Sequence, residues 1–104
     1  MTVTHVTPAT FKKEVLQRPL AIVDMWAEWC MPCKRLAPLF EELSNELKTV
    51  TFAKLNVEEY PELAQEYDVM NIPTLLIFKN GKEVDRITGL VSKEEMKKKI
   101  QSFL

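Results

Sequence analysis

The sequence predicts an α/β fold with its elements in the order β-α-β-α-β-α-β-β-α, formed by one domain over residues 1–104. Three observations support this prediction. The chain has 104 residues, and a domain commonly contains roughly 100–200 residues. Apolar runs of strand length alternate with segments whose apolar residues recur at helical spacing. Asn80 and Gly81, between two strand-like runs, are typical of a tight β-hairpin turn.

The first predicted elements are a short strand, a helix and a buried strand. Residues 3–6 suit a short strand at a sheet edge. Thr7 and Pro8 suit the N-cap and the first position of a helix, which Pro19 ends. Residues 20–26 are almost continuously apolar, as expected of a strand that is covered on both faces in a parallel sheet.

A longer helix is predicted next, ending near residue 48. Pro38 lies inside its pattern, so we expect a kink there. The apolar residues of this helix recur with a period of 3.6 and are Leu36, Leu39, Phe40, Leu43 and Leu47.

The second half of the chain is predicted to contain three strands and two helices. Residues 50–56 alternate as a strand, and residues 61–67 suit a short helix. Residues 74–78 and 84–88 suit the two strands of the hairpin. Ser92 and Glu95 form a capping-box pattern, which predicts a last helix with the apolar residues Met96, Ile100 and Phe103.

Composition and charge exclude several classes of protein. The net charge of −1 argues against the excess of positive charge that binds nucleic acid or an anionic membrane. No apolar run approaches the roughly 18 residues that a membrane span needs. Two glycines are too few for a glycine-rich phosphate loop, and two cysteines are too few for a disulfide scaffold. The first residues lack a secretory pattern, so we expect a cytoplasmic protein whose thiols are kept reduced.

The segment Cys30-Met31-Pro32-Cys33 carries the most specific chemical signal. A C-x-x-C pair between a buried strand and a helix is typical of a redox motif. Cys30 falls at the helix start, where free N–H groups and the helix dipole stabilise a thiolate. Pro32 is tolerated in the first turn, and Cys33 falls one turn on, within reach of Cys30. A disulfide that closes so short a loop contributes only about 2 kcal/mol to the stability of the fold. It is therefore better suited to reversible reduction than to stabilising the structure.

Two other interpretations of the cysteine pair remain open from the residues alone. A zinc site needs four ligands, and the chain offers Cys30, Cys33 and His5 unless two copies share the metal. No metal is therefore expected, and His5 is assigned no role. The cysteines could also be inert and buried, although three of their neighbours argue against a buried segment: Trp29, Pro32 and Lys34.

Several short segments form a pattern along the chain: DMWAEWCMPCK at 24–34, Pro38, FAKLN at 52–56, IPT at 72–74, FKNG at 78–81 and Gly89. In this order and spacing they resemble the thioredoxin family over essentially the whole chain. The resemblance implies a central mixed five-stranded sheet with helices on both faces, in agreement with the predicted element order. Three residues depart from the family: Met31 and Asn71 replace its usual glycines, and Met25 its usual phenylalanine. The first two put the reduction potential and the partner preference in question.

The resemblance implies a thiol–disulfide oxidoreductase, an enzyme that reduces protein disulfides. Cys30 is then the nucleophile, expected to be exposed and to have a low pKa, and Cys33 is the shielded resolving cysteine. Asp24 relays a proton to and from Cys33, and Lys54 modulates Asp24. From the residues, the apolar neighbours of Asp24 indicate burial, which should raise its pKa. Lys54 alone would be taken as a surface lysine.

A substrate-binding surface is also implied, made of Trp29, Met31, Pro32, Ile72, Pro73 and Gly89. By resemblance the Ile72–Pro73 bond is cis, and the residue before the proline offers backbone hydrogen bonds to an extended substrate. Met31 and Met70 should flank this face as an adaptable apolar rim. The alternative is that both methionines pack inward or are neutral surface residues.

The implied partners are protein substrates with disulfides and, as electron donor, a flavoprotein thioredoxin reductase. The protein is expected to be a monomer without a cofactor of its own, and without nucleic-acid or membrane partners. Two other functions remain. One is a thioredoxin-fold oxidase or isomerase, which a secretory signal would have favoured. The other is a non-catalytic binding subunit of a larger complex, in which the cysteines are incidental.

Overall fold

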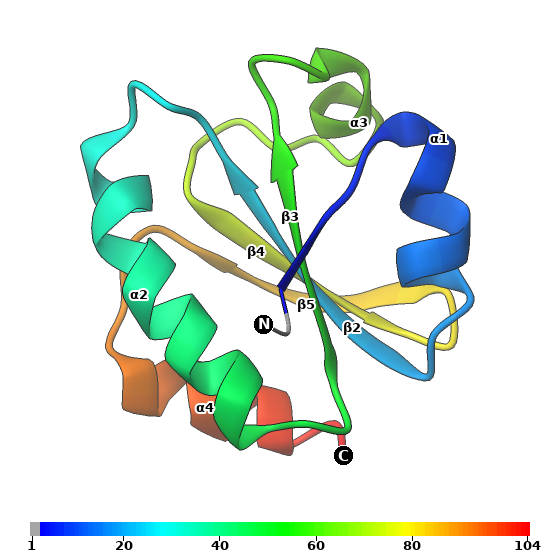
Figure 1. Ribbon diagram of the computed structural model, residues 1–104, viewed down its shortest axis with the longest axis vertical. Coiled ribbons are helices and arrows are strands. Elements are labelled where there is room, and N and C mark those ends of the chain that lie inside the picture. Colours follow the sequence, from blue (N-terminus) through cyan, green and yellow to red (C-terminus); the bar gives the residue numbers. More distant parts are fainter. Residues whose placement is uncertain (1–2) are drawn as a thin grey trace.

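The computed structural model describes residues 3–104, and a five-stranded sheet forms its centre (Figure 1). The strand order is β1-β3-β2-β4-β5. Strands β1, β3 and β2 are parallel, whereas β4 is antiparallel to both β2 and β5. The mixed sheet confirms the predicted fold class. The strand bounds are β1 (Val3–His5), β2 (Leu20–Trp26), β3 (Thr51–Asn56), β4 (Thr74–Lys79) and β5 (Lys82–Thr88).

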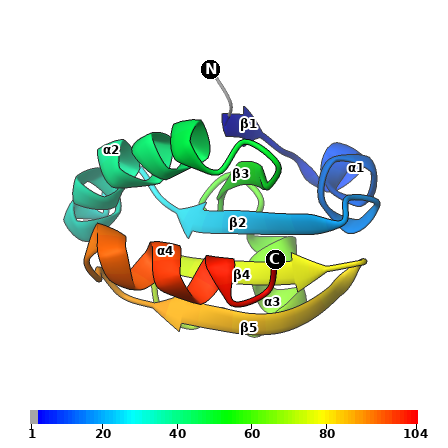
Figure 2. The ribbon, with the colours of Figure 1, turned by 90° about the horizontal axis from the view of Figure 1, so that it is seen from below.

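Helices cover both faces of the sheet. Figures 1 and 2 show α2 and α4 together on one face, with α1 and α3 on the other. The predicted first helix begins as α1 but continues as a π-helical turn, η1, closed by a 2.9 Å hydrogen bond from the Gln17 N–H to the Lys12 carbonyl. The helix bounds are α1 (Pro8–Phe11), η1 (Lys12–Leu16), α2 (Met31–Glu46), α3 (Pro61–Glu66) and α4 (Lys93–Gln101). None of these helices, within residues 3–104, is long and apolar enough to cross a membrane.

Strand β2 is the central strand and separates two apolar cores. Successive side chains of a strand point to opposite faces, so β2 contributes to both cores. Leu20 and Ile22 pack in the core beneath α2 and α4. On the opposite face, which α1 and α3 cover, β2 contributes Ala21, Val23 and Met25. The same alternation places Asp24 on the face that α2 covers.

The predicted hairpin turn lies at the end of the sheet where β2 begins. Asn80 and Gly81 have φ values of 52° and 86°, which glycine and asparagine tolerate better than other residues. The Asn80 N–H donates to the Pro19 carbonyl at 2.9 Å. The turn is therefore tied to the start of β2, and the other end of β2 leads into the cysteine motif.

Candidate active site at the start of helix α2

The two cysteines form a disulfide across the first turn of α2. Cys30 is the N-cap of this helix, and its sulfur accepts a hydrogen bond of 3.2 Å from the Cys33 backbone N–H. The Cα atoms of the pair are 5.3 Å apart. Backbone N–H groups at a helix start stabilise negative charge on a sulfur. The predicted position of Cys30 is thus confirmed, and the helix end favours its thiolate once the disulfide is opened.

The expectation that Cys30 is exposed is wrong for this oxidised form. Cys30 is 3% exposed and Cys33 is 1% exposed. The pair packs with the buried Ala27, and partly buried side chains from three segments cover it: Trp26, Val57 and Ile72. The neighbours Trp29, Pro32 and Lys34 are exposed, as predicted. An exposed segment therefore carries two covered sulfur atoms, so exposure of the neighbours does not report exposure of the cysteines.

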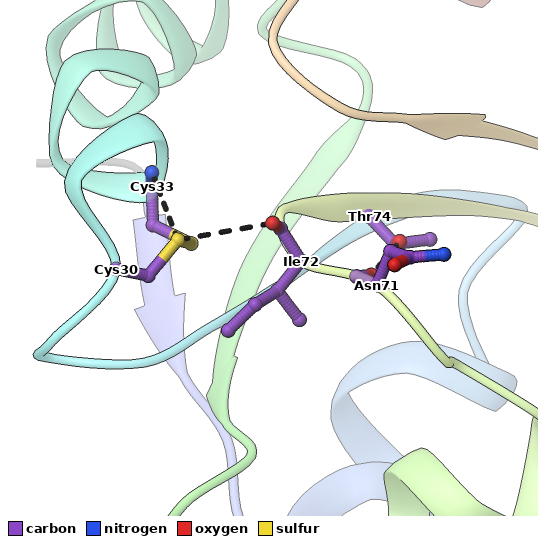
Figure 3. The surroundings of a disulfide bond; sticks show 5 residues. All are labelled: Cys30, Cys33, Asn71, Ile72 and Thr74. Atoms are coloured by element: carbon purple, nitrogen blue, oxygen red, sulfur yellow. Dashed lines mark hydrogen bonds between the residues drawn. A yellow bond between two sulfur atoms is a disulfide. The ribbon is translucent and has the colours of Figure 1, made fainter.

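The loop before β4 approaches the disulfide from the opposite side. The Cys30 sulfur lies 3.8 Å from the Ile72 carbonyl oxygen (Figure 3), which would accept a hydrogen bond from the reduced thiol. The Ile72–Pro73 peptide bond is cis, as the resemblance implied. The Gly89 N–H donates to the Pro73 carbonyl at 2.8 Å, which joins the end of β5 to this loop. Ile72 thus contacts the cysteines, and Pro73 and Gly89 belong to the backbone that holds this loop in place.

Asp24 is a buried carboxyl on the same side of the sheet as α2. It is completely buried, and within residues 3–104 neither carboxyl oxygen has a hydrogen-bond partner. Burial disfavours the charged form and raises the pKa to about 7, while the positive charge of Lys54 acts in the opposite direction. The expected burial and the raised pKa are confirmed. A carboxyl with a pKa near neutrality can both accept and return a proton.

Lys54 interacts with both Asp24 and Trp26. Lys54 is paired in register with Asp24 on the neighbouring strand, and its ammonium lies 4.5 Å from the centre of the Trp26 ring. An ammonium over an aromatic face is a cation–π contact. The lysine is therefore half-buried beside the acid rather than free at the surface.

The remaining residues of the predicted substrate surface are exposed at the start of α2. Trp29 is 67% exposed and Met31 is 59% exposed, and Pro32 is exposed as well. Among residues 3–104, no three His, Cys, Asp or Glu side chains are grouped in a way that could hold a metal. The geometry instead provides a dithiol couple, a buried acid and an apolar surround.

Comparison with known proteins identifies the family. The family model described as Thioredoxin matches residues 2–102. The chain belongs to the thioredoxin family. It is 47% identical to a thioredoxin of Rickettsia felis over 94 residues, which covers 88% of this chain and 90% of the relative. A thioredoxin of Pyropia yezoensis is 38% identical over 106 residues, which cover 100% of this chain and 99% of the relative.

A solved structure agrees with this assignment. A mutant thioredoxin from Halobacterium salinarum superposes with a TM-score of 0.90 at 30% identity, covering 97% of this chain and 89% of that chain. Family membership and the Cys30–Cys33 disulfide together identify this thioredoxin-family protein as a thiol–disulfide oxidoreductase.

Three contacts of this thioredoxin site were not foreseen from the sequence. Val57 covers the cysteines, and the Thr74 hydroxyl donates to the Asn71 carbonyl at 2.5 Å (Figure 3). Trp26 also carries the Lys54 contact. Val57 and Trp26 act through tertiary contacts that no local pattern in the sequence marks, whereas Thr74 and Asn71 are only three residues apart.

Proposed function

We propose that this thioredoxin-family protein is a protein-disulfide reductase. One observation carries the proposal most directly: Cys30 caps α2 while its sulfur accepts the Cys33 N–H. Reduction of the disulfide leaves a Cys30 thiolate that this N–H and the helix end stabilise. A thiolate is the species that attacks a disulfide.

The first step is attack of the Cys30 thiolate on one sulfur of a substrate disulfide. A new sulfur–sulfur bond joins Cys30 to the substrate, and the substrate bond breaks. The other substrate sulfur leaves as a thiolate and takes a proton from solvent. The product of this step is a mixed disulfide, with Cys33 still a thiol.

The second step is attack by Cys33, for which Asp24 is the proposed proton acceptor. The ionised Asp24 carboxylate takes the Cys33 proton, because its pKa of about 7 leaves much of it ionised at neutral pH. The Cys33 sulfur then bonds to Cys30 and expels the substrate sulfur, which takes up a proton. Two electrons have passed to the substrate, and the protein is left with the Cys30–Cys33 disulfide. In this scheme the positive charge of Lys54 lowers the pKa of Asp24.

Substrate and donor complete the proposed cycle. An extended substrate segment docks by its backbone beside Ile72, against Trp29, Pro32 and Gly89. Each turnover needs two electrons from outside, for which the proposed source is a flavoprotein thioredoxin reductase. The protein is proposed to act as a monomer in the cytoplasm, without a bound cofactor of its own.

The proposal is tested by reduction of insulin disulfides with dithiothreitol as the electron source. The wild-type protein is expected to accelerate insulin reduction well above the rate with dithiothreitol alone, and Cys30→Ser is the matched control that should abolish the acceleration. Equal rates with wild type, Cys30→Ser and dithiothreitol alone would contradict a reductase function.

A further inference from the structure

Four large apolar side chains are exposed in the segments next to the disulfide: the start of α2, the loop before β4 and the residues after β5. Trp29 and Met31 flank Cys30 in the chain, and they are 67% and 59% exposed. Met70 is 87% exposed and Leu90 is 41% exposed. We call these four residues the apolar rim. Both methionines point outward, so they do not pack into the core.

Backbone contacts hold the two halves of the apolar rim on either side of the sulfur atoms. The Cys30 sulfur contacts the Ile72 carbonyl at 3.8 Å (Figure 3), and Met70 precedes Ile72 by two residues. The Gly89 N–H bonds to the Pro73 carbonyl at 2.8 Å, which brings Leu90 to the same loop. Trp29 and Met31 therefore lie on the helix side of Cys30, with Met70 and Leu90 on the loop side.

The burial of Cys30 brings a substrate close to this rim. Only 3% of Cys30 is exposed, yet its sulfur must come within bonding distance of a substrate sulfur. Trp26, Val57 and Ile72 cover Cys30, so the residues beside the substrate cysteine must lie over the exposed segments around these side chains, which carry the apolar rim. Recognition next to the disulfide consequently depends on the chemistry of the apolar rim.

That chemistry is apolar and adaptable. None of the four rim side chains carries a charge, and the neighbouring Glu28 is paired with Lys34 at 3.6 Å. A charged substrate residue placed over the rim would lose water without gaining a partner, which is costly. Unbranched thioethers, by contrast, adjust their shape to different apolar side chains.

We propose that Met31 and Met70 are specificity-determining residues, which select protein disulfides whose neighbouring residues are apolar. This inference rests on the proposed reductase function and adds to it the class of substrate. The favoured substrate segment carries leucine-like or aromatic side chains beside its cysteine, whereas a segment with acidic neighbours is reduced more slowly.

The test compares two disulfide-bridged peptides that differ only beside one cysteine, where one has two leucines and the other has two glutamates. The quantity measured is the ratio of kcat/KM for the leucine peptide to that for the glutamate peptide. For the wild type we expect a ratio of about ten, because apolar contacts of this size discriminate by about tenfold or more. The double variant Met31→Gln with Met70→Gln should reduce the ratio to about two.

Two control variants separate polarity from other effects. Met31→Leu with Met70→Leu keeps the rim apolar and should keep the wild-type ratio. Leu104→Gln changes an exposed apolar residue, 64% exposed, that lies with Pro19 and Asn80 at the other end of β2; it should also keep the ratio. Urea unfolding of each variant verifies that it folds.

The outcomes distinguish this inference from the function on which it rests. A wild-type ratio near one, or an unchanged ratio in the double glutamine variant, would overturn the role of the methionines while leaving the reductase function intact. Failure of the wild type to reduce either peptide or insulin would overturn the reductase function, and the specificity with it.

Discussion

The two faces of the central sheet bury their side chains in different ways. On the face beneath α1 and α3, β2 contributes only apolar residues, and three aromatic rings pack against one another: Phe11, Tyr67 and Phe78, with centroids 5.3–5.8 Å apart. On the face beneath α2, the same strand buries Asp24, whose oxygens have no partner within residues 3–104. The first face is organised for packing, and the second accepts a costly acid on the side of the sheet that carries the disulfide helix.

The cost of that acid can be expressed as free energy. A pKa of about 7 in place of 3.8, at 1.36 kcal/mol per pH unit, corresponds to roughly 4 kcal/mol of destabilisation at alkaline pH. Native proteins are stable by only about 5–15 kcal/mol. The proton-transfer role proposed for Asp24 would account for the retention of a residue that reduces stability this much.

The largest effect is expected from the cysteines on the chemical face. Cys33→Ser should abolish turnover and accumulate a mixed disulfide with a bridged peptide, because the resolving thiol is absent. Cys30→Ser should abolish turnover without accumulating the adduct, because the remaining thiol is buried behind it. Mass spectrometry of the acid-quenched reactions measures both adducts. Greater accumulation with Cys30→Ser would assign the nucleophile to Cys33 instead.

The next largest effect compares neighbouring residues on opposite faces. Asp24→Asn should stabilise the protein by about 2–4 kcal/mol at pH 8.5, since it removes a buried charge and keeps the shape. Val23→Asn, which places the same amide in the apolar face, should destabilise it by about 3 kcal/mol or more. Urea unfolding gives both values. If both variants were destabilised alike, the two faces would not differ in the way described.

The pH dependence of the Asp24→Asn effect has a defined sign. Because the folded-state pKa is raised, the contribution of Asp24 to stability is fully present below about pH 3.8 and is lost as the pH rises to about 7. The free energy of unfolding of the wild type should therefore fall across this window relative to the variant, and the difference should level off above pH 7. A difference that stays constant from pH 4 to pH 8.5 would contradict burial of an ionisable Asp24.

A smaller effect is expected from Lys54, which lowers the pKa of Asp24 by its charge. Lys54→Met should raise that pKa further, and the change should be smaller than the effect of burial. Carboxyl-carbon NMR titration of Asp24 measures the pKa directly. Lys48→Met, at an exposed lysine beyond the end of α2, is the matched control and should leave it unchanged. An Asp24 pKa that is the same in the Lys54 variant and the wild type would show that the two charges do not interact.

The smallest effect on stability is expected at the apolar rim. Hydrogen peroxide should convert the exposed Met31 and Met70 of the oxidised protein to sulfoxides well before Met25 and Met96, which are completely buried. The free energy of unfolding should change by less than about 0.5 kcal/mol, as for most exposed positions. Peptide mapping locates the oxidised residues, and early oxidation of Met25 would show that the core opens more readily than its packing indicates.

Local patterns in the sequence predicted much of the fold. The bounds of β2 match the apolar run at 20–26, because a strand covered on both faces leaves that signal in consecutive residues. The Asn80-Gly81 turn and the position of Cys30 at a helix start were equally local. Each of these features depends on residues within one short segment.

The covering of the disulfide could not be predicted in the same way. Trp26, Val57 and Ile72 come from three segments and meet only when the sheet forms, so nothing near Cys30 in the sequence showed that its sulfur would be covered. The π-helical end of the first helix was also missed, because its apolar spacing suits an α-helix. The cis bond before Pro73 could be predicted only from the family resemblance, because most peptide bonds before proline are trans.

The most direct test of the account is the pH dependence of the second chemical step. The measurement is the rate at which Cys33 resolves a preformed mixed disulfide on Cys30, followed from pH 5 to pH 9 in the wild type and in Asp24→Asn. If Asp24 accepts the Cys33 proton, the wild-type rate should rise with an inflection near pH 7, and the variant should be slower and lack that inflection. Equal rates with the same inflection in both proteins would contradict a role for the buried acid in the reaction.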